Sequence, residues 1–495
     1  MCCGVGNLEV KHSNPRNIYM STLDAADIDV MRATKTCVAA QRFQYDYLND
    51  DITDDGNIDY NLTNKVPVGL RQAIAEGKKL IVLINPPYGE TGSGIGKGNL
   101  NKNKVEQTRI NALMKANEAG YGSKELFVQF LARISQEIPI ATIAMFSTLK
   151  YVNSPNFDKF RQSWNSKYLG GFLVHSKAFD GLKGDFPIGF LIWKTNQNSK
   201  IRSPITEITA DVFNKNVQAI GQKKFYNLPI ATYLNAWIKK PATNNELALP
   251  LSNATKVSDN PRRKKSCTNM IGFLYASNND LQHAGQETCI TSSIYTGGNG
   301  GGLYITSENI SKAAVLFSVR RLIKPTWLND RDQFLQPNAP LNDKFENDCL
   351  IWMLFNGSNL TASANDLEWN GRKWEIVNHF IPYAEAEVNA PDRFESDFMV
   401  RYLAKMKHSY EANAVLDVGR TLWQAYFSET DVRSVREELK LDRPDVGWYQ
   451  IRNALRARNA SGDKIAVDFK PFEAAYISLS DKLRPQVFKL GFLRA

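Results

Sequence analysis

Four consecutive residues, Asn85-Pro86-Pro87-Tyr88, have the groups needed to bind and activate a poorly nucleophilic amino group. The Asn85 amide oxygen and the Pro86 carbonyl are two acceptors, which can hold both hydrogens of one amino group and favour a tetrahedral nitrogen. Tyr88 offers a flat face on which a planar ring can stack, and the two prolines stiffen the turn. The alternative is an ordinary turn after a strand, since Asn-Pro is a common turn opener.

The tetrapeptide directly follows the apolar run 79–84 (KLIVLI), and this place in the chain supports a binding role. Both faces of the run are apolar, which predicts a central strand of a parallel sheet. Ligands of open α/β sheets bind at the carboxyl ends of strands, where residues 85–88 would lie. The next segment, 89–98 (GETGSGIGKG), is similar to a phosphate-binding loop, but Thr91 and Gly98 stand where that motif needs Gly and then Ser or Thr. It is expected to be a loop that closes over the ligand, or a linker without function.

Two segments near the start of the chain have residue types suited to a nucleoside cofactor. Cys3-Gly4-Val5-Gly6 is a Gly-rich turn that lets the backbone approach a ligand closely, and a flexible terminal turn is the alternative. Asp24 follows the predicted strand 17–23, where a carboxylate can hold ribose hydroxyls. Thr22 could occupy that place instead, because the register of the strand is open.

A third acid, Asp46, begins the segment Asp46-Tyr47-Leu48 after a short predicted strand at 43–45. Its carboxylate can accept a hydrogen bond from the amino group of a cofactor adenine. Asp24 and Asp46 could each be a surface carboxylate or a helix cap instead.

The order of these motifs resembles that of the amino-methyltransferase family, particularly the gamma-class DNA adenine-N6 methyltransferases. The resemblance covers residues 1 to about 200. It implies S-adenosylmethionine as cofactor and methyl transfer to the N6 amino group of adenine in double-stranded DNA, as in restriction-modification systems. The cofactor residues implied are Cys3, Gly4, Gly6, Asp24, Asp46 and Tyr47.

In this family a later segment supplies an aromatic side chain that packs on the opposite side of the target base. The segment 179–190 (FDGLKGDFPIGF) is similar to it, with Phe186 as the aromatic; packing in the core at a strand start is the alternative. The implied mechanism extrudes the adenine from the duplex, which costs on the order of a few kcal/mol. Stacking between Tyr88 and Phe186 would return about 1–3 kcal/mol per base.

The resemblance and the pattern of apolar runs predict an α/β fold, namely a Rossmann-like methyltransferase sheet with an antiparallel pair at one end. Residues 1–225 would form this catalytic domain, 226–391 a mixed α+β target-recognition region, and 392–495 a mainly helical region. The further elements expected are helices 25–41, 125–136, 400–410, 420–427 and 432–441, a strand at 138–146, and the strand pair 169–175 and 187–194.

Composition favours a polyanionic partner and argues against a metal site. The chain has 61 Lys and Arg against 51 Asp and Glu, a formal net charge of +10, which suits phosphate binding. The cysteines and histidines are scattered without metal-ligand or disulfide spacing. No apolar run is long enough to span a bilayer, and no leader opens the chain, so we expect a cytoplasmic enzyme of bacterial or phage origin.

Sequence recognition is expected in the middle third. The candidate DNA contacts are Arg262, Arg263, Lys264 and Lys265 in one run and Arg320 and Arg321 in another, although such runs are often only a solvated face. The Gly-rich stretch 297–302 is a hinge or a point of close backbone approach. A restriction or specificity subunit stays open.

The sequence departs from the family at its start. The family's first strand ends with an acid just before the Gly-rich turn, whereas Met1 falls immediately after that place. We therefore expect this strand to be missing, with two exposed ladder edges and weak cofactor binding. A catalytically impaired DNA-binding remnant is thus the second interpretation, and methylation of protein glutamine or of RNA adenine is a further alternative.

Overall fold

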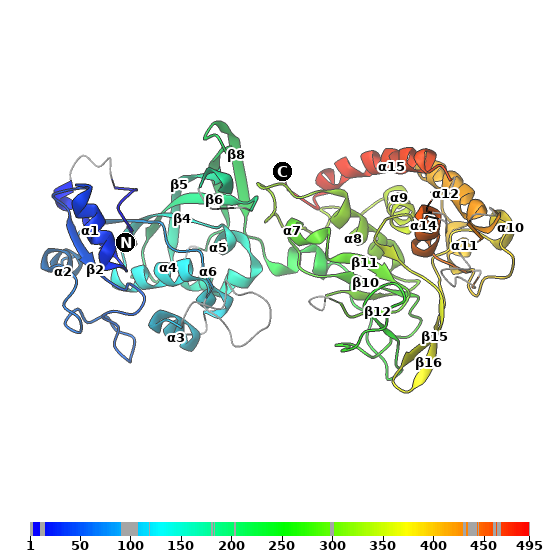
Figure 1. Ribbon diagram of the computed structural model, residues 1–495, viewed down its shortest axis with the longest axis horizontal. Helices are drawn as coiled ribbons and strands as arrows, with labels where there is room; N and C mark the ends of the chain where they lie inside the picture. Colours follow the sequence, from blue (N-terminus) through cyan, green and yellow to red (C-terminus); the bar gives the residue numbers. More distant parts are fainter. Residues whose placement is uncertain are drawn as a thin grey trace. The chain divides into compact units, whose positions relative to one another are not determined.

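The computed structural model describes residues 3–9, 15–90, 107–117, 119–179, 182, 184–201, 204–297, 301–428, 432–433, 443, 445–458, 462 and 467–494. The chain divides into two compact units (Figure 1). The first contains Met1–Leu228 together with Thr326–Arg331, and the second contains Pro229–Pro325 and Asp332–Ala495. The predicted target-recognition and C-terminal regions both fall mainly in the second unit, and their roles stay predictions.

The first unit is built around a six-stranded mixed sheet of order β3-β4-β6-β5-β7-β8. Its strands are β3 (Leu80–Ile84), β4 (Ala141–Ser147), β5 (Ser166–His175), β6 (Pro187–Thr195), β7 (Glu207–Phe213) and β8 (Ala219–Tyr226). β3 and β4 are parallel, β6 is antiparallel to both β4 and β5, and β7 is parallel to β5. The register of β5 against β6 confirms that 169–175 and 187–194 pair antiparallel, but this pair lies in the middle of the sheet and not at its end, because β7 and β8 extend the sheet beyond β5.

The strand β3 stands at one end of this sheet, so the prediction of a central strand is wrong for the described residues. Val82 and Ile84 are buried, but Ile81 is 77% exposed. The apolar pattern anticipated burial on both faces, whereas the described part of the unit covers the run on one side only.

The strands β1 (Tyr19–Thr22) and β2 (Gln41–Gln44) form a separate two-stranded parallel sheet. Between them α1 runs from Ala25 to Ala33, shorter than the predicted helix 25–41. The chain leaves the helix because Lys35 and Cys37 have positive φ angles of 57° and 47°, a conformation that a right-handed helix does not contain.

The helix α4 (Leu126–Glu137) is the main helix of the first unit and confirms the predicted helix 125–136. Its apolar side chains, among them Phe127, Leu131 and Ile134, are buried in the core with residues of β3, β4 and β6. The other α-helices of this unit are α2 (Val68–Ala75), α3 (Arg109–Ala116), α5 (Lys150–Asn153) and α6 (Asp158–Ser163). Short segments of 3-10 helix lie at Pro15–Asn17, Gly120–Lys124, Pro155–Phe157 and Ser176–Ala178.

The second unit combines short strands with a large helical core. A four-stranded sheet has the order β13-β10-β11-β14, and two-stranded sheets pair β12 with β9 and β15 with β16. The strands are β9 (Pro250–Leu251), β10 (Gly272–Ala276), β11 (Thr288–Thr291), β12 (Ile294–Tyr295), β13 (Leu303–Ile305), β14 (Asn359–Leu360), β15 (Ala364–Trp369) and β16 (Arg372–Ile376).

The α-helices of the second unit are α7 (Leu281–Ala284), α8 (Ile310–Leu322), α9 (Asp343–Leu354), α10 (Glu385–Val388), α11 (Phe398–Leu403), α12 (Tyr410–Ser428), α14 (Trp448–Arg456) and α15 (Lys470–Lys489). Among them α8, α9, α12, α14 and α15 share one apolar core. The predicted helix 420–427 lies within α12, but the predicted helix 400–410 is divided between α11 and the start of α12. Of the predicted helix 432–441, only Val432 and Arg433 lie within the described residues. No helix in the described ranges has the length and apolar character needed to cross a bilayer.

Candidate active site

The predicted catalytic residues, the Asn85–Tyr88 corner and Phe186, lie at one edge of the six-stranded sheet. Because β3, β4, β5 and β7 run in the same direction, their carboxyl ends share that edge. The Asn85–Tyr88 corner follows β3 there. The strand β6 runs the opposite way and begins at this edge with Pro187, directly after Phe186. The topology thus brings the Asn85–Tyr88 corner and Phe186 to the same edge of the sheet.

The corner itself is held by a hydrogen bond between its first and last residues. The Tyr88 hydroxyl donates to the Asn85 amide oxygen at 3.1 Å. Asn85 is exposed, Pro86 is buried, and Tyr88 is 40% exposed. Desolvation raises the pKa of the Tyr88 phenol, so this hydroxyl stays protonated and remains a donor. The Asn85 oxygen keeps a second lone pair for a ligand.

A charged cluster that the sequence did not reveal fixes the chain just after the corner. The backbone nitrogen of Leu126, at the start of α4, donates to the Gly89 carbonyl at 3.0 Å. Lys150, at the start of α5, places its ammonium 2.7 Å from a Glu125 carboxylate oxygen and 3.5 Å from Glu90. Burial raises the pKa of the Glu125 carboxyl against the opposing effect of Lys150. These three side chains come from separate parts of the chain, and their spacing in the sequence does not predict that they are in contact.

Phe186 is half-buried and tied to the end of β5 through Ser176. The Ser176 backbone nitrogen donates to the Phe186 carbonyl at 3.0 Å, and the Phe186 nitrogen donates to the Ser176 hydroxyl at 3.3 Å. At the end of β5, the centroids of the His175 and Trp327 rings lie 4.8 Å apart. Part of the predicted segment 179–190, namely Asp180, Gly181 and Lys183, lies outside the described residues.

The predicted cofactor segments meet at the carboxyl edge of the β1–β2 sheet. The Cys3 nitrogen donates to the Ser21 carbonyl at 3.1 Å, and the Tyr45 nitrogen donates to the Thr22 carbonyl at 2.8 Å. Gly4 and Gly6 have φ angles of +50° and +80°, which glycine adopts at little cost. A side chain at Gly4 would meet no atom within 4 Å, whereas one at Gly6 would press on Met20 and Thr36. The turn therefore leaves open space at Gly4, whereas Gly6 packs closely against Met20 and Thr36.

Both candidate acids already have local roles. Asp24 is the N-cap of α1, where its carboxylate accepts from the Ala26 nitrogen at 2.9 Å. Asp46 accepts from the Leu48 nitrogen at 3.1 Å and from the Asn49 side chain at 2.8 Å. Each carboxylate has lone pairs beyond those used. Binding of a ribose or an adenine by these acids stays a prediction.

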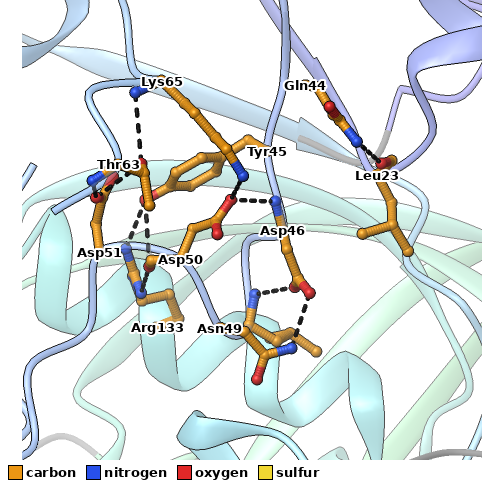
Figure 2. A network of polar contacts seen from close by, with 11 residues as sticks. Leu23, Gln44, Tyr45, Asp46, Asn49, Asp50, Asp51, Thr63, Lys65 and Arg133 are labelled. Carbon is orange, nitrogen blue, oxygen red and sulfur yellow. Dashed lines mark hydrogen bonds and ion pairs between the residues drawn. The ribbon is translucent and has the colours of Figure 1, made fainter.

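Polar contacts with Asp50, Lys65 and Arg133 hold the loop that carries Asp46 in place (Figure 2). The Asp50 carboxylate accepts from the Asp46 nitrogen at 2.9 Å and from Lys65 at 2.8 Å. The buried guanidinium of Arg133, on α4, donates to the Asp50 carbonyl at 3.1 Å and to the Tyr45 hydroxyl at 2.9 Å. The position of Asp46 thus depends on a network that reaches the core.

Tyr47 lies in that core rather than at the surface. Its side chain is buried, stacks on Phe130 with ring centroids 5.7 Å apart, and donates to the Glu137 carboxylate. The predicted cofactor residue Tyr47 could therefore contact a ligand only through its backbone.

The helix α4 connects the two groups of candidate residues. Leu126 contacts the chain after the corner through Gly89, and Phe130 contacts Tyr47. The two positions are one helical turn apart, about 6 Å along the axis. The corner and the Asp46 loop are thus attached to successive turns of one helix, while a cleft shared by the corner and the Gly4–Gly6 turn stays a prediction.

The predicted DNA contacts differ from one another in exposure. Arg320 is fully buried on α8 and donates to Thr288 and to the carbonyls of Ser277 and Asn278, and burial lowers its pKa to about 10. A side chain in this position does not reach a phosphate, so Arg320 is not kept as a DNA contact. Arg321 is half-buried and bonded to Asn356.

The other basic run lies at the surface. Arg262, Lys264 and Lys265 are exposed, while Arg263 lies over the Phe273 ring at 5.3 Å and donates to the Gly301 carbonyl. Of the stretch 297–302, Gly302 has a φ of +122°, and a side chain there would meet the Leu274 carbonyl at 2.5 Å. Close backbone approach therefore accounts for glycine at that position.

No protein-family model matches the sequence, and no curated protein matches it. Several solved structures superpose on part of the chain. The DrdV–DNA complex has a TM-score of 0.29 and 13% identity over 53% of this chain and 29% of that one. The ATP-dependent type ISP restriction-modification enzyme LlaBIII, bound to DNA, has a TM-score of 0.30 and 11% identity over 55% and 20%. A DNMT2 variant from Spodoptera frugiperda has a TM-score of 0.20 and 11% identity over 47% and 55%. This chain thus spans less than two thirds of each of these proteins, and TM-scores this low support no conclusion about function.

Proposed function

We propose that the protein transfers a methyl group from S-adenosylmethionine to the N6 amino group of adenine in double-stranded DNA. The observation that carries the proposal is the Asn85–Tyr88 corner at the carboxyl end of β3, on the same sheet edge as Phe186. The polar acceptors of an amino-group site and two aromatic rings from separate elements would then act on one planar ligand.

The corner would act on the adenine amino group through its two acceptors. The Asn85 amide oxygen has one lone pair engaged by the Tyr88 hydroxyl and one free, and the Pro86 carbonyl is the second acceptor. Holding both amino hydrogens favours a tetrahedral nitrogen with an available lone pair. Tyr88 and Phe186 would stack on the two faces of the flipped base, and each stacking contact returns about 1–3 kcal/mol of the cost of flipping.

The residues at the β1–β2 edge fit the nucleoside end of the cofactor, which when bound supplies the electrophilic sulfonium methyl group. Gly4 leaves open space where a ligand can approach the backbone. Asp24 and Asp46 follow the carboxyl ends of β1 and β2, where carboxylates can accept from ribose hydroxyls and from the adenine amino group. The bracing of Asp46 by Asp50 would keep that carboxylate in place.

The second unit would contribute DNA contacts through the exposed residues Arg262, Lys264 and Lys265. Each lysine or arginine that neutralises a phosphate releases counterions and increases affinity at low salt. A catalytically impaired DNA-binding protein is the second candidate, because the described strands β1 and β2 do not join the six-stranded sheet.

Transfer of labelled methyl groups from S-adenosylmethionine tests the proposal. The purified chain and its Asn85→Ala variant are incubated with duplex DNA, with RNA and with a glutamine-containing peptide, and modified nucleosides are identified by mass spectrometry. N6-methyladenine in DNA, formed by the unchanged chain alone, is the expected result. Label in RNA or in the peptide would replace the proposed substrate, and DNA binding without any transfer would favour the second candidate.

A further inference from the structure

The hairpin formed by β7 and β8 carries exposed apolar side chains and an exposed lysine at its tip. The strand β7 ends at Phe213 and β8 begins at Ala219, so the tip lies at the same sheet edge as the Asn85–Tyr88 corner. We infer that this tip contacts the DNA duplex beside the target adenine, an inference that rests on the proposed function.

The tip is a built structure with its own hydrogen bonds. The Asn214 nitrogen donates to the Gln218 carbonyl at 3.0 Å, and the Val217 nitrogen donates to the Asn214 carbonyl at 2.9 Å. The Asn214 side-chain oxygen also accepts from the nitrogens of Asn216 at 2.9 Å and Gln218 at 3.1 Å. A turn held this way presents its side chains with little entropy left to lose on binding.

The apolar side chains of the tip face solvent in a way that folding does not explain. Val217 is 66% exposed and has a φ of +61°, a left-handed conformation that disfavours a β-branched residue. Ile220, on the outermost strand of the sheet, is 53% exposed. Sheet edges in soluble proteins are usually protected by charge, and exposed apolar groups there mark an interaction surface.

The charge of the tip favours a nucleic acid over an apolar protein partner. Lys215 is exposed and forms no ion pair within the described part of the chain. Lys224 lies on the same hairpin but away from the tip, opposite Thr209, and forms an ion pair with Glu207 at 3.5 Å. Branched apolar side chains beside a lysine are groups that proteins place in the minor groove, where the apolar part wedges between bases and the lysine contacts a phosphate.

The spacing of the sheet sets the place of this contact on the duplex. Between β3 and β7 lie β4, β6 and β5, so four strand spacings of about 4.8 Å separate the corner from the hairpin, or about 19 Å. At about 3.4 Å per base pair this distance corresponds to roughly five to six base pairs. The hairpin would therefore contact the duplex on one side of the target adenine and not the flipped base itself.

The test compares the double variant Lys215→Glu, Val217→Asn with a matched variant on the opposite sheet edge, Lys200→Glu, Ile201→Asn. Lys200 and Ile201 are also exposed, and they lie in the connection between the end of β6 and the start of β7. Dissociation constants are measured by fluorescence anisotropy on duplexes with ten or four base pairs beside the target adenine, trimmed on either side in turn.

We expect the unchanged chain to lose roughly tenfold in affinity when one particular side is trimmed, because the tip contact is removed. The Lys215→Glu, Val217→Asn variant should bind the long duplex about as weakly as the trimmed one, show no further loss on trimming, and have a salt-dependence slope smaller by about one. The control variant should behave like the unchanged chain. Asn tolerates the left-handed conformation, so Val217→Asn alone should raise Tm while weakening DNA binding, which a merely structural valine would not do.

Equal affinity of the tip variant and the control variant for the long duplex would overturn the inference, and so would a tip variant that changes only self-association in sedimentation. Methyl transfer is measured on the same samples. Transfer by the unchanged chain without a flank effect leaves the proposed function in place and removes the hairpin contact. A flank effect without any transfer keeps the contact and removes the proposed reaction.

Discussion

The two units each bury an arginine, and the surroundings of the two guanidinium groups differ in kind. Arg133 in the first unit has a buried carboxylate partner, Glu137, at 3.4 Å. Arg320 in the second unit donates to the Thr288 hydroxyl and to two backbone carbonyls, with no carboxylate within ion-pair distance among the described residues. Burial opposes the charge in both, but Glu137 and nearby tyrosines outweigh it at Arg133, whose pKa is raised, whereas the pKa of Arg320 falls to about 10.

This difference separates a buried charge that supports a loop at the candidate site from one that supports only the fold. Arg133 lies beneath the Asp46 loop and bonds to its backbone at Asp50, together with Tyr45 (Figure 2). Arg320 donates to the carbonyls of Ser277 and Asn278, which lie in the segment between β10 and β11 of its own unit. Changes in the first unit should therefore affect both stability and cofactor binding, and changes at Arg320 should affect stability alone.

The largest effect is expected for Glu137→Gln. Removing the carboxylate leaves the Arg133 charge buried without its partner, and breaking one member of such a pair costs about 3–5 kcal/mol. Urea denaturation followed by circular dichroism measures this loss. The matched control is Glu76→Gln, since Glu76 forms an exposed pair with Lys78 and should leave the unfolding midpoint unchanged. A Glu137→Gln variant as stable as this control would show that Arg133 does not need its carboxylate.

The next largest effect is expected for Asn85→Ala, measured on activity. Loss of one of two acceptors for the amino group should lower the rate of adenine methylation by about 100- to 1000-fold, the usual effect of removing one preorganised hydrogen-bond partner. Asn85 is exposed, so the unfolding curve should stay the same. Steady-state and single-turnover rates with duplex DNA check the prediction. Methylation by the variant at the original rate would remove the corner from the mechanism.

A smaller effect, on stability alone, is expected for Arg320→Met. The variant leaves the Ser277 and Asn278 carbonyls without their donor but also removes an unpaired buried charge, so we expect a loss of about 2 kcal/mol. DNA affinity of the folded protein should not change. The contrasting variant, Lys264→Glu with Lys265→Glu, should keep its stability and lose about two from the slope of the salt dependence. Weaker DNA binding by a fully folded Arg320→Met variant would restore Arg320 as a contact.

The strands of the first unit can be predicted from the sequence, but the burial of Arg320 cannot. Apolar runs placed β3, β4, β5 and β6 within a few residues, because strand burial leaves a strong local pattern. The predicted helix 25–41 extends beyond the end of α1, since the left-handed residues Lys35 and Cys37 have no distinctive side chains. An Arg-Arg pair in the sequence looks the same whether its helix is exposed or buried, so charge alone does not distinguish a DNA contact from a buried arginine such as Arg320.

The candidate site was predictable in part for a related reason. A motif such as Asn85-Pro86-Pro87-Tyr88 is contiguous, and its place after an apolar run is visible in the chain. The cluster of Glu90, Glu125 and Lys150 depends on contacts across sixty residues, and only the folded arrangement of β3, α4 and α5 brings it together. Contiguous candidate residues are thus easier to predict from the sequence than the residues that position them.

The smallest effect is expected for Tyr88→Phe, which separates the stacking role of this ring from its hydrogen bond. The variant keeps the aromatic face but loses the 3.1 Å bond that orients the Asn85 amide. A neutral hydrogen bond contributes about 0.5–1 kcal/mol, so the methylation rate should fall about twofold to fivefold. Because the hydroxyl acts through Asn85, the double variant with Asn85→Ala should be no slower than Asn85→Ala alone. Tyr121→Phe, which removes a hydroxyl bonded to the nearby Glu90, serves as the matched control. Additive rate losses in the double variant would show that the Tyr88 hydroxyl acts on the substrate directly.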